Sequence, residues 1–367
     1  MVEDGPGRDR YNRLSVCEAW EIIELVMYRY NVHGLFSFTS NIPHFEGMLH
    51  AFRSEEEISG LSSFRFILDP GLKIPKVGKQ RINLMLYHNP HDNSIEFDYQ
   101  WFVPISAKLS FLKNPPGYVF SFNRNYLRVS QLVGGGWTLV SIFRSLLQMT
   151  LVRKRMLMLY GGAINIGDSG ILFPAVENIG KTTTAWMLAK RGARYVTDEY
   201  VILDTEGRCY GIPCSSFLTP TTIKTLGLKL ARGEKIALAL NYLKGRILTI
   251  HLSSGGTAID PDRFFKVCSA MKVNKLAIIQ NGTDFVRRMG KDEALSKVKV
   301  IQSIEFPWKT NPYVLAHWYF NPELDMKSLS SQEDSLLDSA ISRIPDLYLV
   351  SSSSREHYKA IEKLAVE

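Results

Sequence analysis

Cysteine is scarce in this sequence of 367 residues, and long hydrophobic runs are absent from it. The cysteines form no CxxC pair, which excludes a zinc ribbon and a disulfide framework and predicts buried, reduced thiols at Cys17, Cys209, Cys214 and Cys268. No uncharged apolar run reaches the roughly 18 residues that a transmembrane helix needs. The first residues also lack the apolar core of a signal peptide. We therefore expect a cytoplasmic protein without a membrane partner.

The composition is that of a folded chain with a large core, since 45% of the residues are hydrophobic, 11% aromatic and 22% charged. A chain of this length usually forms two domains. Lysine and arginine number 44 against 36 aspartates and glutamates, which gives a net charge of +8. That excess favours acidic partners and does not choose among a nucleotide, a nucleic acid and a phosphorylated protein.

The first third of the chain predicts a helix followed by β-strands. Apolar residues recur every three or four positions over residues 14–30, which predicts an amphipathic helix. Over residues 64–130 the period changes to two, with a strand at 95–103 and a hairpin that joins 109–112 to 118–122. We expect a small, antiparallel, β-rich domain in this part.

Three consecutive glycines, residues 134–136, precede a new helical segment. We interpret them as a flexible joint because no lysine-threonine pair follows them, and we place the domain boundary there. Residues 1–135 then form an N-terminal β-rich α+β domain that recognises a substrate or partner. Residues 136–367 form an α/β domain, in which apolar strands over 156–166 and 171–173 flank a glycine-containing turn.

The strongest motif is a phosphate-binding loop at residues 175–183, with the sequence Ala-Val-Glu-Asn-Ile-Gly-Lys-Thr-Thr. It matches G-x4-G-K-[ST] with alanine in place of the first glycine, and it lies between a predicted strand and a predicted helix. Backbone amides of such a loop converge on phosphate oxygens at the positive end of the helix. Lys181 would reach the β- and γ-phosphates, Thr182 would bind Mg2+, and Thr183 would contact the α-phosphate. The alternative is a chance match in a surface loop. The residues expected to bind the nucleotide are Ala175, Glu177, Asn178, Ile179, Gly180, Lys181, Thr182 and Thr183.

Two adjacent carboxylates, Asp198 and Glu199, interrupt the next apolar run 17 positions after Lys181. Their burial is costly unless a metal, a cation or solvent compensates the charge, and a Mg2+-nucleotide would do so. On an extended chain, one side chain can face the metal while the other faces an acceptor hydroxyl. The alternative is a solvated strand end or an ion pair with Arg191 or Arg194.

The segment from about residue 159 to 203 resembles the core of the HPr kinase/phosphorylase-like P-loop kinases, which are structurally similar to ATP-dependent phosphoenolpyruvate carboxykinase. The resemblance depends on the loop together with the acidic pair on the following strand. It implies a P-loop kinase fold for the second domain, ATP and Mg2+ as cofactors, and Lys181, Asp198 and Glu199 as catalytic residues. Thr182 and Asp198 match the metal site, and Glu199 stands where the base is expected, although the roles of the two acids stay open.

Three departures from the family pattern bear on the substrate. Tyr160 stands where many members have histidine, and Pro213 and Pro220 lie where the downstream glycine-rich signature is expected. The N-terminal domain does not resemble the classical one. HPr itself is therefore not the expected substrate.

Together these features predict an ATP-dependent kinase, a phosphotransferase that transfers the γ-phosphoryl group to an alcohol. The unidentified acceptor is a hydroxyl of a protein, a peptide or a small molecule. Two alternatives are left open: an ATP-gated binding module that phosphorylates nothing, and a kinase directed to RNA. The only support for nucleic-acid binding is the net charge. The resemblance implies a homo-oligomer, because related kinases assemble as oligomers.

Weaker signals occur further along the chain. Between residues 224 and 246, six basic residues stand against one acid, Glu234, which suits a binding patch and a solvated helix face equally. Asp260, Asp262 and Arg263 are expected at a helix start, with a supporting role for Arg263 at the nucleotide site as the alternative. Structural positions in the core are predicted for His251, His317, Trp318, Trp101 and Tyr118.

Overall fold

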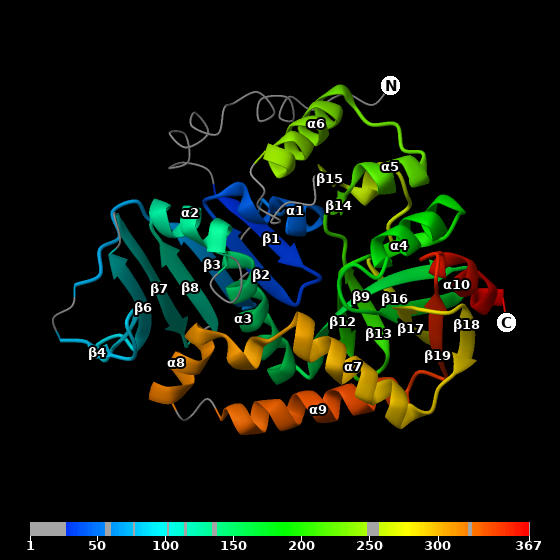
Figure 1. Cartoon of the computed structure of the whole chain (residues 1–367). Helices are drawn as coiled ribbons and strands as arrows, with labels where there is room; N and C mark the ends of the chain where they lie inside the picture. The colour runs from blue at the N-terminus through cyan, green and yellow to red at the C-terminus, as the bar shows by residue number, and fades with distance from the viewer. Residues whose placement is uncertain are drawn as a thin grey trace.

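The chain forms a mixed α/β structure on two large β-sheets, drawn in blue to cyan and in green to red in Figure 1. The computed structural model describes residues 27–55, 60–75, 78–100, 103–113, 116–133, 138–247, 257–321 and 325–366. Within these ranges, no helix combines the length and the apolar character that crossing a membrane requires. The two sheets and the helices around them confirm the expectation of a mixed α/β fold.

The first sheet has, in the described part of the chain, eight strands in the order β1-β2-β3-β8-β7-β6-β5-β4. These strands are β1 (Tyr28–Val32), β2 (Phe36–Ser40), β3 (Ser62–Leu68), β4 (Gln80–Arg81), β5 (Leu86–Asn89), β6 (Ser94–Gln100), β7 (Pro104–Leu112) and β8 (Gly117–Phe122). Burial alternates along β1 and β2 because successive side chains of a strand point to opposite faces. The predicted hairpin is confirmed as the antiparallel pair of β7 and β8, and β6 occupies most of the strand predicted before it.

The expectation of a purely antiparallel first sheet is wrong. β3 pairs in parallel with both of its neighbours, β2 and β8. A parallel pair needs a crossover connection, and between β2 and β3 the chain supplies one that carries the short helices η2 (Pro43–Phe45), α1 (Glu46–Leu49) and η3 (His50–Phe52). Alternation of apolar and polar residues predicts where a strand lies, but it does not determine whether the strand pairs in parallel or antiparallel with its neighbours.

The end of the helix predicted over residues 14–30 is also wrong. Tyr28 and Tyr30 belong to β1, where they are buried and pair with β2. Pairing with a neighbouring strand has overridden the helical spacing of the apolar residues. The rest of that predicted helix lies outside the described residues.

The second sheet has nine described strands, in the order β16-β13-β12-β9-β10-β17-β19-β18, and β11 pairs with β9. They are β9 (Met156–Ile166), β10 (Ser169–Pro174), β11 (Arg194–Thr197), β12 (Tyr200–Asp204), β13 (Arg208–Ile212), β16 (Ala270–Lys272), β17 (Lys275–Asn281), β18 (Phe285–Arg288) and β19 (Asp346–Ser352). A separate ribbon joins β14 (Ser216–Leu218) to β15 (Thr257–Ile259). Both strands predicted around the glycine turn are confirmed as β9 and β10.

Helices cover both faces of the second sheet (Figure 1). The helices that follow the first sheet are α2 (Arg124–Val133), α3 (Leu139–Arg153), α4 (Lys181–Lys190), α5 (Pro220–Leu226), α6 (Arg232–Ile247), α7 (Lys291–Glu305), α8 (Pro312–Phe320), α9 (Met326–Ser342) and α10 (His357–Val366). On one face of the sheet, α4 and α10 pack in a core with Ile171 and Phe173 of β10. On the other face, α3, α7 and α9 pack in a core with Leu172. Successive side chains of β10 therefore pack in different cores.

Helix α3, the one predicted after the three glycines, contacts both sheets. Phe143 packs against an aromatic cluster of the first sheet and its crossover, formed by Phe36, Phe38, Phe45, Phe64 and Phe66. The same helix lies against β9 of the second sheet. The glycines themselves lie outside the described residues, and the boundary after residue 135 stays a prediction.

The predicted thiols and core residues can be compared with their burial. Cys209 and Cys214 are buried, as expected, and burial raises the pKa of both thiols. Cys268 is partly exposed. Cys17 lies outside the described residues.

Two of the predicted core positions are buried and one is not. Tyr118 is buried, and so is His317, whose ring stacks on Phe111 and whose pKa is lowered to about 3 by burial. Trp318 is 41% exposed, so its assignment to the core is wrong. The other two, Trp101 and His251, lie outside the described residues.

Candidate functional site

The segment 175–180 forms a loop between β10 and α4, so strand, loop and helix follow one another in the predicted order. Gly180 precedes α4 with φ +110°, and Asn178 also has a positive φ, +61°. An added Cβ at position 180 would find its nearest atom 3.7 Å away, so space alone does not demand glycine. The left-handed backbone does, because it lets the loop turn directly into the positive end of the helix.

Lys181 is buried in the first turn of α4, with 5% of its surface exposed. Its Nζ donates to the carbonyl oxygens of Ala175 (3.0 Å) and Val176 (2.8 Å) and lies 4.0 Å from the centre of the Tyr160 ring. Burial lowers the pKa of Lys181 to about 8, and the neighbouring carboxylates of Glu305 and Glu199 oppose that shift. Among the described residues, no carboxylate forms an ion pair with this lysine. The cation is therefore available to an external anion.

The rest of the loop is open to solvent on one side. Glu177 and Asn178 are exposed, whereas Ala175 is buried and Ile179 packs against the α4 core. The backbone amide of Glu177 donates to Oε1 of Glu305, at the end of α7, over 2.8 Å. One loop amide thus already binds an anionic oxygen.

Thr182 and Thr183 lie in the first turn of α4 and are partly exposed. Across the described ranges, neither hydroxyl has a hydrogen-bond partner. Both positions can therefore accept a ligand without breaking an existing contact.

Asp198 and Glu199 form the two-residue bend between β11 and β12. Asp198 is buried, and each of its carboxylate oxygens accepts one hydroxyl: Oδ1 from Tyr195 (2.7 Å) and Oδ2 from Ser216 (2.8 Å). Ser216 in turn accepts a hydrogen bond from the indole of Trp186 on α4. Both hydrogen-bond donors of this carboxylate are neutral hydroxyls, so they bring no positive charge that would compete with a bound cation.

Glu199 has different surroundings. It is partly exposed, and its carboxylate accepts a hydrogen bond from the Tyr200 hydroxyl, which also accepts one from Arg144 Nη1 (2.8 Å). Desolvation raises the pKa of Glu199 to about 7, although the Tyr200 hydrogen bond and the charges of Arg144 and Lys181 act in the opposite direction. Such a carboxylate exchanges a proton near neutral pH.

The structural alternatives for the acidic pair are not borne out. Arg191 pairs with Glu362, and Arg194 donates to the carbonyl of Gly167. Neither arginine contacts the acidic pair, and the burial of Asp198 excludes a fully solvated strand end. Instead, the charge of Lys181 interacts with both carboxylates.

Several residues near the loop were not found from the sequence. Arg144 comes from α3, Glu305 from α7 and Ser216 from β14, and no spacing rule connects them with the loop. Arg355 precedes α10, and its Cβ would lie 3.8 Å from a Cβ added to Gly180. It is an exposed cation with φ +60°, and a positive φ in a non-glycine residue is the signal that draws attention to it.

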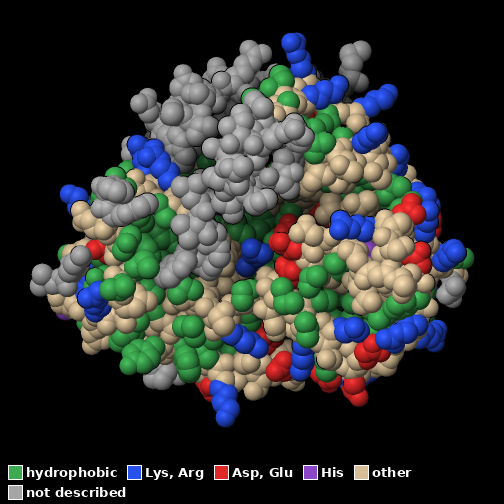
Figure 2. All heavy atoms as spheres, viewed as in Figure 1, with side chains coloured by type: hydrophobic (Ala, Val, Ile, Leu, Met, Phe, Trp, Pro, Cys, Tyr) green, Lys and Arg blue, Asp and Glu red, His purple; other side chains and the backbone are tan. Residues whose placement is uncertain are grey.

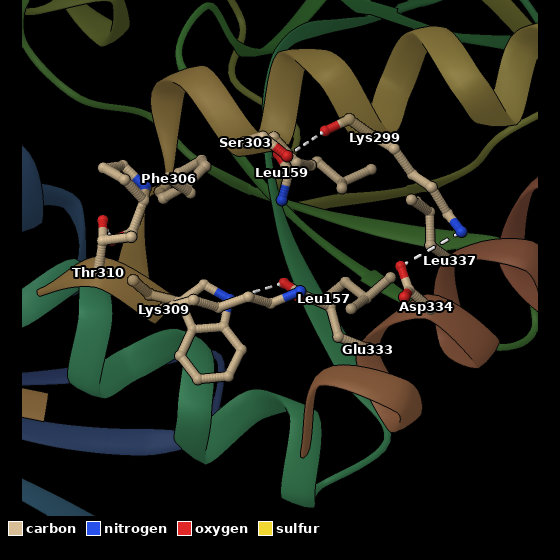
Figure 3. Close-up of a pocket in the computed structure, with 13 residues that line it drawn as sticks. Leu157, Leu159, Lys299, Ser303, Phe306, Lys309, Thr310, Glu333, Asp334 and Leu337 are labelled. Atoms are coloured by element: carbon tan, nitrogen blue, oxygen red, sulfur yellow. Dashed lines mark hydrogen bonds and ion pairs between the residues drawn. The ribbon is translucent and has the colours of Figure 1, made fainter. Parts of the chain in front are cut away.

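A cavity of about 250 Å3 lies elsewhere, on the face of the second sheet that α7 and α9 cover (Figure 3). Its apolar wall includes Leu157 and Leu159 of β9. The charged groups in it pair with one another, Lys309 with Glu333 and Lys299 with Asp334. These charges of the cavity wall are therefore compensated within the protein, and none of the predicted site residues lines the cavity.

The basic segment over 224–246 is only partly described. Lys224, Lys229, Arg232 and Lys235 are exposed, and Figure 2 shows basic side chains over the region of α5 and α6. Both explanations, a binding patch and a solvated helix face, are compatible with this exposure.

The predicted helix start at residues 260–263 is a short 3-10 helix, η5 (Pro261–Arg263). Asp260 occupies the N-cap position, but its side chain makes no capping hydrogen bond. Arg263 pairs with Glu234 of α6 instead of approaching the loop.

Neither the protein-family models nor the curated proteins compared with this sequence give a match. The family resemblance of residues 159–203 therefore stays a prediction from the motif.

Proposed function

We propose that this protein is an ATP-dependent kinase that transfers the γ-phosphoryl group to a hydroxyl acceptor. The main support is one juxtaposition at the start of the helix after a phosphate-loop motif. There a buried lysine, which forms no ion pair with any described residue, lies near a carboxylate whose pKa is about 7. The lysine is Lys181, and the carboxylate is that of Glu199. Buried charges and shifted pKa values concentrate at sites where charge is bound or moved.

The residues present suit a Mg2+-nucleotide. The loop amide that holds Glu305 would hold a phosphate oxygen as readily, because both are anionic acceptors. Thr182 and Asp198 would hold Mg2+, which prefers oxygen ligands, and Thr183 would bond a phosphate. Bound Mg2+ would neutralise part of the phosphate charge.

The protein groups have distinct tasks in the proposed transfer. Lys181 exchanges its two carbonyl acceptors for oxygens of the β- and γ-phosphates. Glu199 takes the proton of the acceptor hydroxyl. At the same time the acceptor oxygen bonds to the γ-phosphorus, and the bond between that phosphorus and the departing ADP oxygen breaks. Tyr200 orients Glu199, and Arg144 orients Tyr200.

A second candidate function is an ATP-gated binding module. One observation favours it: Phe143 and Arg144 are neighbours on α3, and the first packs in the first sheet while the second bonds Tyr200 beside Glu199. Nucleotide binding could thereby alter the first sheet without any transfer.

The deciding experiment combines purified full-length protein, Mg2+ and γ-labelled ATP with separate pools of proteins, hydroxyl-bearing small molecules and RNA. We expect label in one pool. Glu199→Gln should reduce transfer at least about a hundredfold and leave ATP affinity unchanged, because it removes the base and keeps the side-chain shape. Glu206→Gln, at an exposed site, is the matched control.

The pH dependence sharpens the same experiment. The kcat/KM of the wild type should rise with pH through about 7, as Glu199 ionises, and fall above about 8, as Lys181 loses its proton. Transfer at the wild-type rate by Glu199→Gln would contradict the kinase proposal. ATP binding without label in any pool would favour the binding module, and label only in RNA would identify an RNA-directed kinase.

A further inference from the structure

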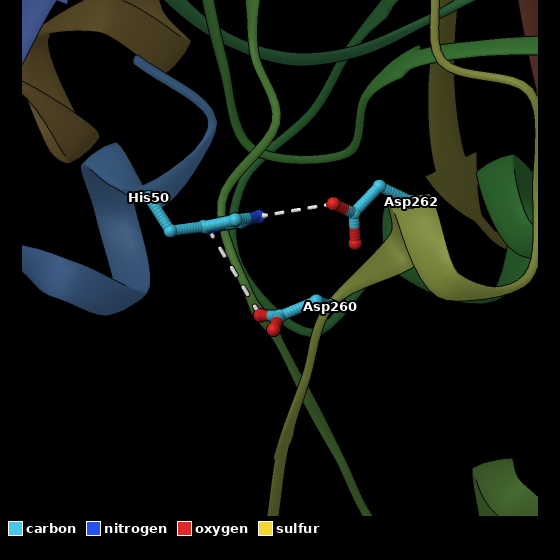
Figure 4. A group of neighbouring side chains, drawn as sticks. All are labelled: His50, Asp260 and Asp262. Carbon is cyan, nitrogen blue, oxygen red and sulfur yellow. Dashed lines mark ion pairs between the residues drawn. The ribbon is translucent and has the colours of Figure 1, made fainter. Parts of the chain in front are cut away.

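Three metal-ligating side chains meet where the first sheet's crossover faces the β14–β15 ribbon (Figure 4). His50 begins η3, whereas Asp260 and Asp262 lie at η5, directly after β15. The His50 ring lies between the two carboxylates, with Nδ1 4.0 Å from Oδ1 of Asp260 and Nε2 4.0 Å from Oδ2 of Asp262. One ligand atom from each residue can be chosen so that all three lie within 4.8 Å of one another.

The His50 ring lacks a hydrogen-bond partner, and neither aspartate has a basic partner among the described residues. Both ring nitrogens of His50 are buried without a hydrogen bond, and a buried polar atom in that condition is costly. In the described part of the chain, no lysine or arginine pairs with Asp260 or Asp262, and the nearby Arg263 pairs with Glu234. The cluster therefore combines uncompensated negative charge with a nitrogen lone pair.

We propose that His50, Asp260 and Asp262 bind a divalent transition-metal cation of the Zn2+ class. A point equidistant from three atoms at these spacings lies about 2.3 to 2.8 Å from each, so small movements would bring the ligands to the roughly 2.0 to 2.2 Å of zinc coordination. Both aspartates are on the surface, 41% and 49% exposed, which leaves them room to move and lets water complete the coordination. An imidazole beside carboxylates favours Zn2+ over Mg2+, which prefers oxygen ligands.

The position of this site gives the metal a structural consequence. Asp260 accepts a hydrogen bond from the Ser215 hydroxyl, and the Ser215 amide donates to the carbonyl of Gly47 in α1. The next residue, Ser216, bonds Asp198. A bound metal would therefore fix the crossover of the first sheet against the strand that positions Asp198. Metal binding itself does not depend on the proposed kinase activity.

The test is a Zn2+ titration of the metal-stripped full-length protein, followed by calorimetry and, with Co2+ as the probe, by visible absorption. We expect one high-affinity equivalent in the wild type. His50→Gln and Asp262→Asn should each weaken that binding more than about tenfold, because even loss of an outer-shell partner costs about that much. His91→Gln, at an exposed histidine in a turn of the first sheet, is the matched control and should bind as the wild type does.

Each outcome decides the proposal. Zn2+ binding that is lost in both variants and kept in the control supports it, and the exposed position of Asp262 guards against misfolding as the cause. Absence of a stoichiometric site in the wild type would overturn it, and the cluster would then be a structural contact between His50 and the two aspartates. Equal affinity in the wild type and His50→Gln would also overturn it, since the metal would then be bound elsewhere.

Discussion

The two sheets of this protein compensate buried charge in different ways. In the first sheet, Glu96 is 2% exposed and pairs with Lys79 and Lys108, while Asn89 and Ser94 also donate to it. Beside the second sheet, Lys181 and Glu199 are desolvated, and neither forms an ion pair with another described residue. A buried charge that is already paired needs no ligand, whereas desolvated charges without an opposite partner are typical of sites that receive a charged ligand. The comparison separates a structural charge cluster from a candidate active site.

Breaking the saturated cluster should have the largest effect on stability. Lys79→Met leaves Glu96 with Lys108, at 3.6 Å, as its one cationic partner among the described residues, and removal of one partner from a buried pair typically costs about 3 kcal/mol. We expect a loss of this size in the free energy of unfolding, measured by urea denaturation at neutral pH.

A surface pair provides the control for that experiment. Arg191 and Glu362 are both about two-fifths exposed, so Arg191→Met should cost less than about 1 kcal/mol. Equal losses in the two variants would show that the Glu96 cluster is no more structural than a surface ion pair.

Neutralising the isolated carboxylate should have the opposite sign. The pKa of Glu199 is raised to about 7 in the folded protein, so the unfolded chain ionises first and the stability of the fold decreases as pH rises from about 4.5 to 7. Glu199→Gln removes this penalty. We expect the variant to be about 1 to 2 kcal/mol more stable than the wild type at pH 8, allowing for partial exposure of the group.

The pH dependence identifies the cause of that gain. At pH 4, where Glu199 is mostly protonated in both states, the two proteins should unfold at nearly the same urea concentration. A gain of the same size at both pH values would mean that packing, rather than charge, explains it. Glu206→Gln should have no effect at either pH because that glutamate is exposed.

The smallest expected effect concerns Arg355, an exposed cation beside the loop. If the loop binds phosphate, Arg355→Gln should weaken ATP binding by about threefold to tenfold and leave stability unchanged, because solvent screens an exposed charge. Lys363→Gln, at an exposed position in α10, should bind ATP as the wild type does. Equal affinities of Arg355→Gln and the wild type would restrict the site to the loop and the acidic bend.

Local patterns were sufficient for the elements around the loop and insufficient elsewhere. β9, β10 and α4 follow from apolar runs bounded by glycine, and these signals lie within the segments themselves. The parallel pairing of β3 depends on partners far away in the sequence. The partner of β1 is close in sequence, since β2 begins four residues after β1 ends, but the spacing of the apolar residues favoured a helix over this pairing.

The candidate site divides in the same way. Lys181, Asp198 and Glu199 were predicted because a motif and a short spacing connect them. Arg144 and Glu305 reach the same region from distant helices, and only the folded chain brings them there. The distinction between Asp198 and Glu199 also required the structure, because it depends on which hydroxyls each carboxylate accepts.

Helix α3 gives Phe143 to the aromatic cluster of the first sheet and another side to β9. Residues 1–135 therefore lack one side chain that fills the interior of the first sheet, and residues 136–367 carry an aromatic side chain that the first sheet covers. Fragments cut near residue 135 would expose that interior to water, and they would be expected to aggregate when produced singly and to reassociate when produced together. Helix α3 must therefore stay with the first sheet for that sheet to keep its described interior.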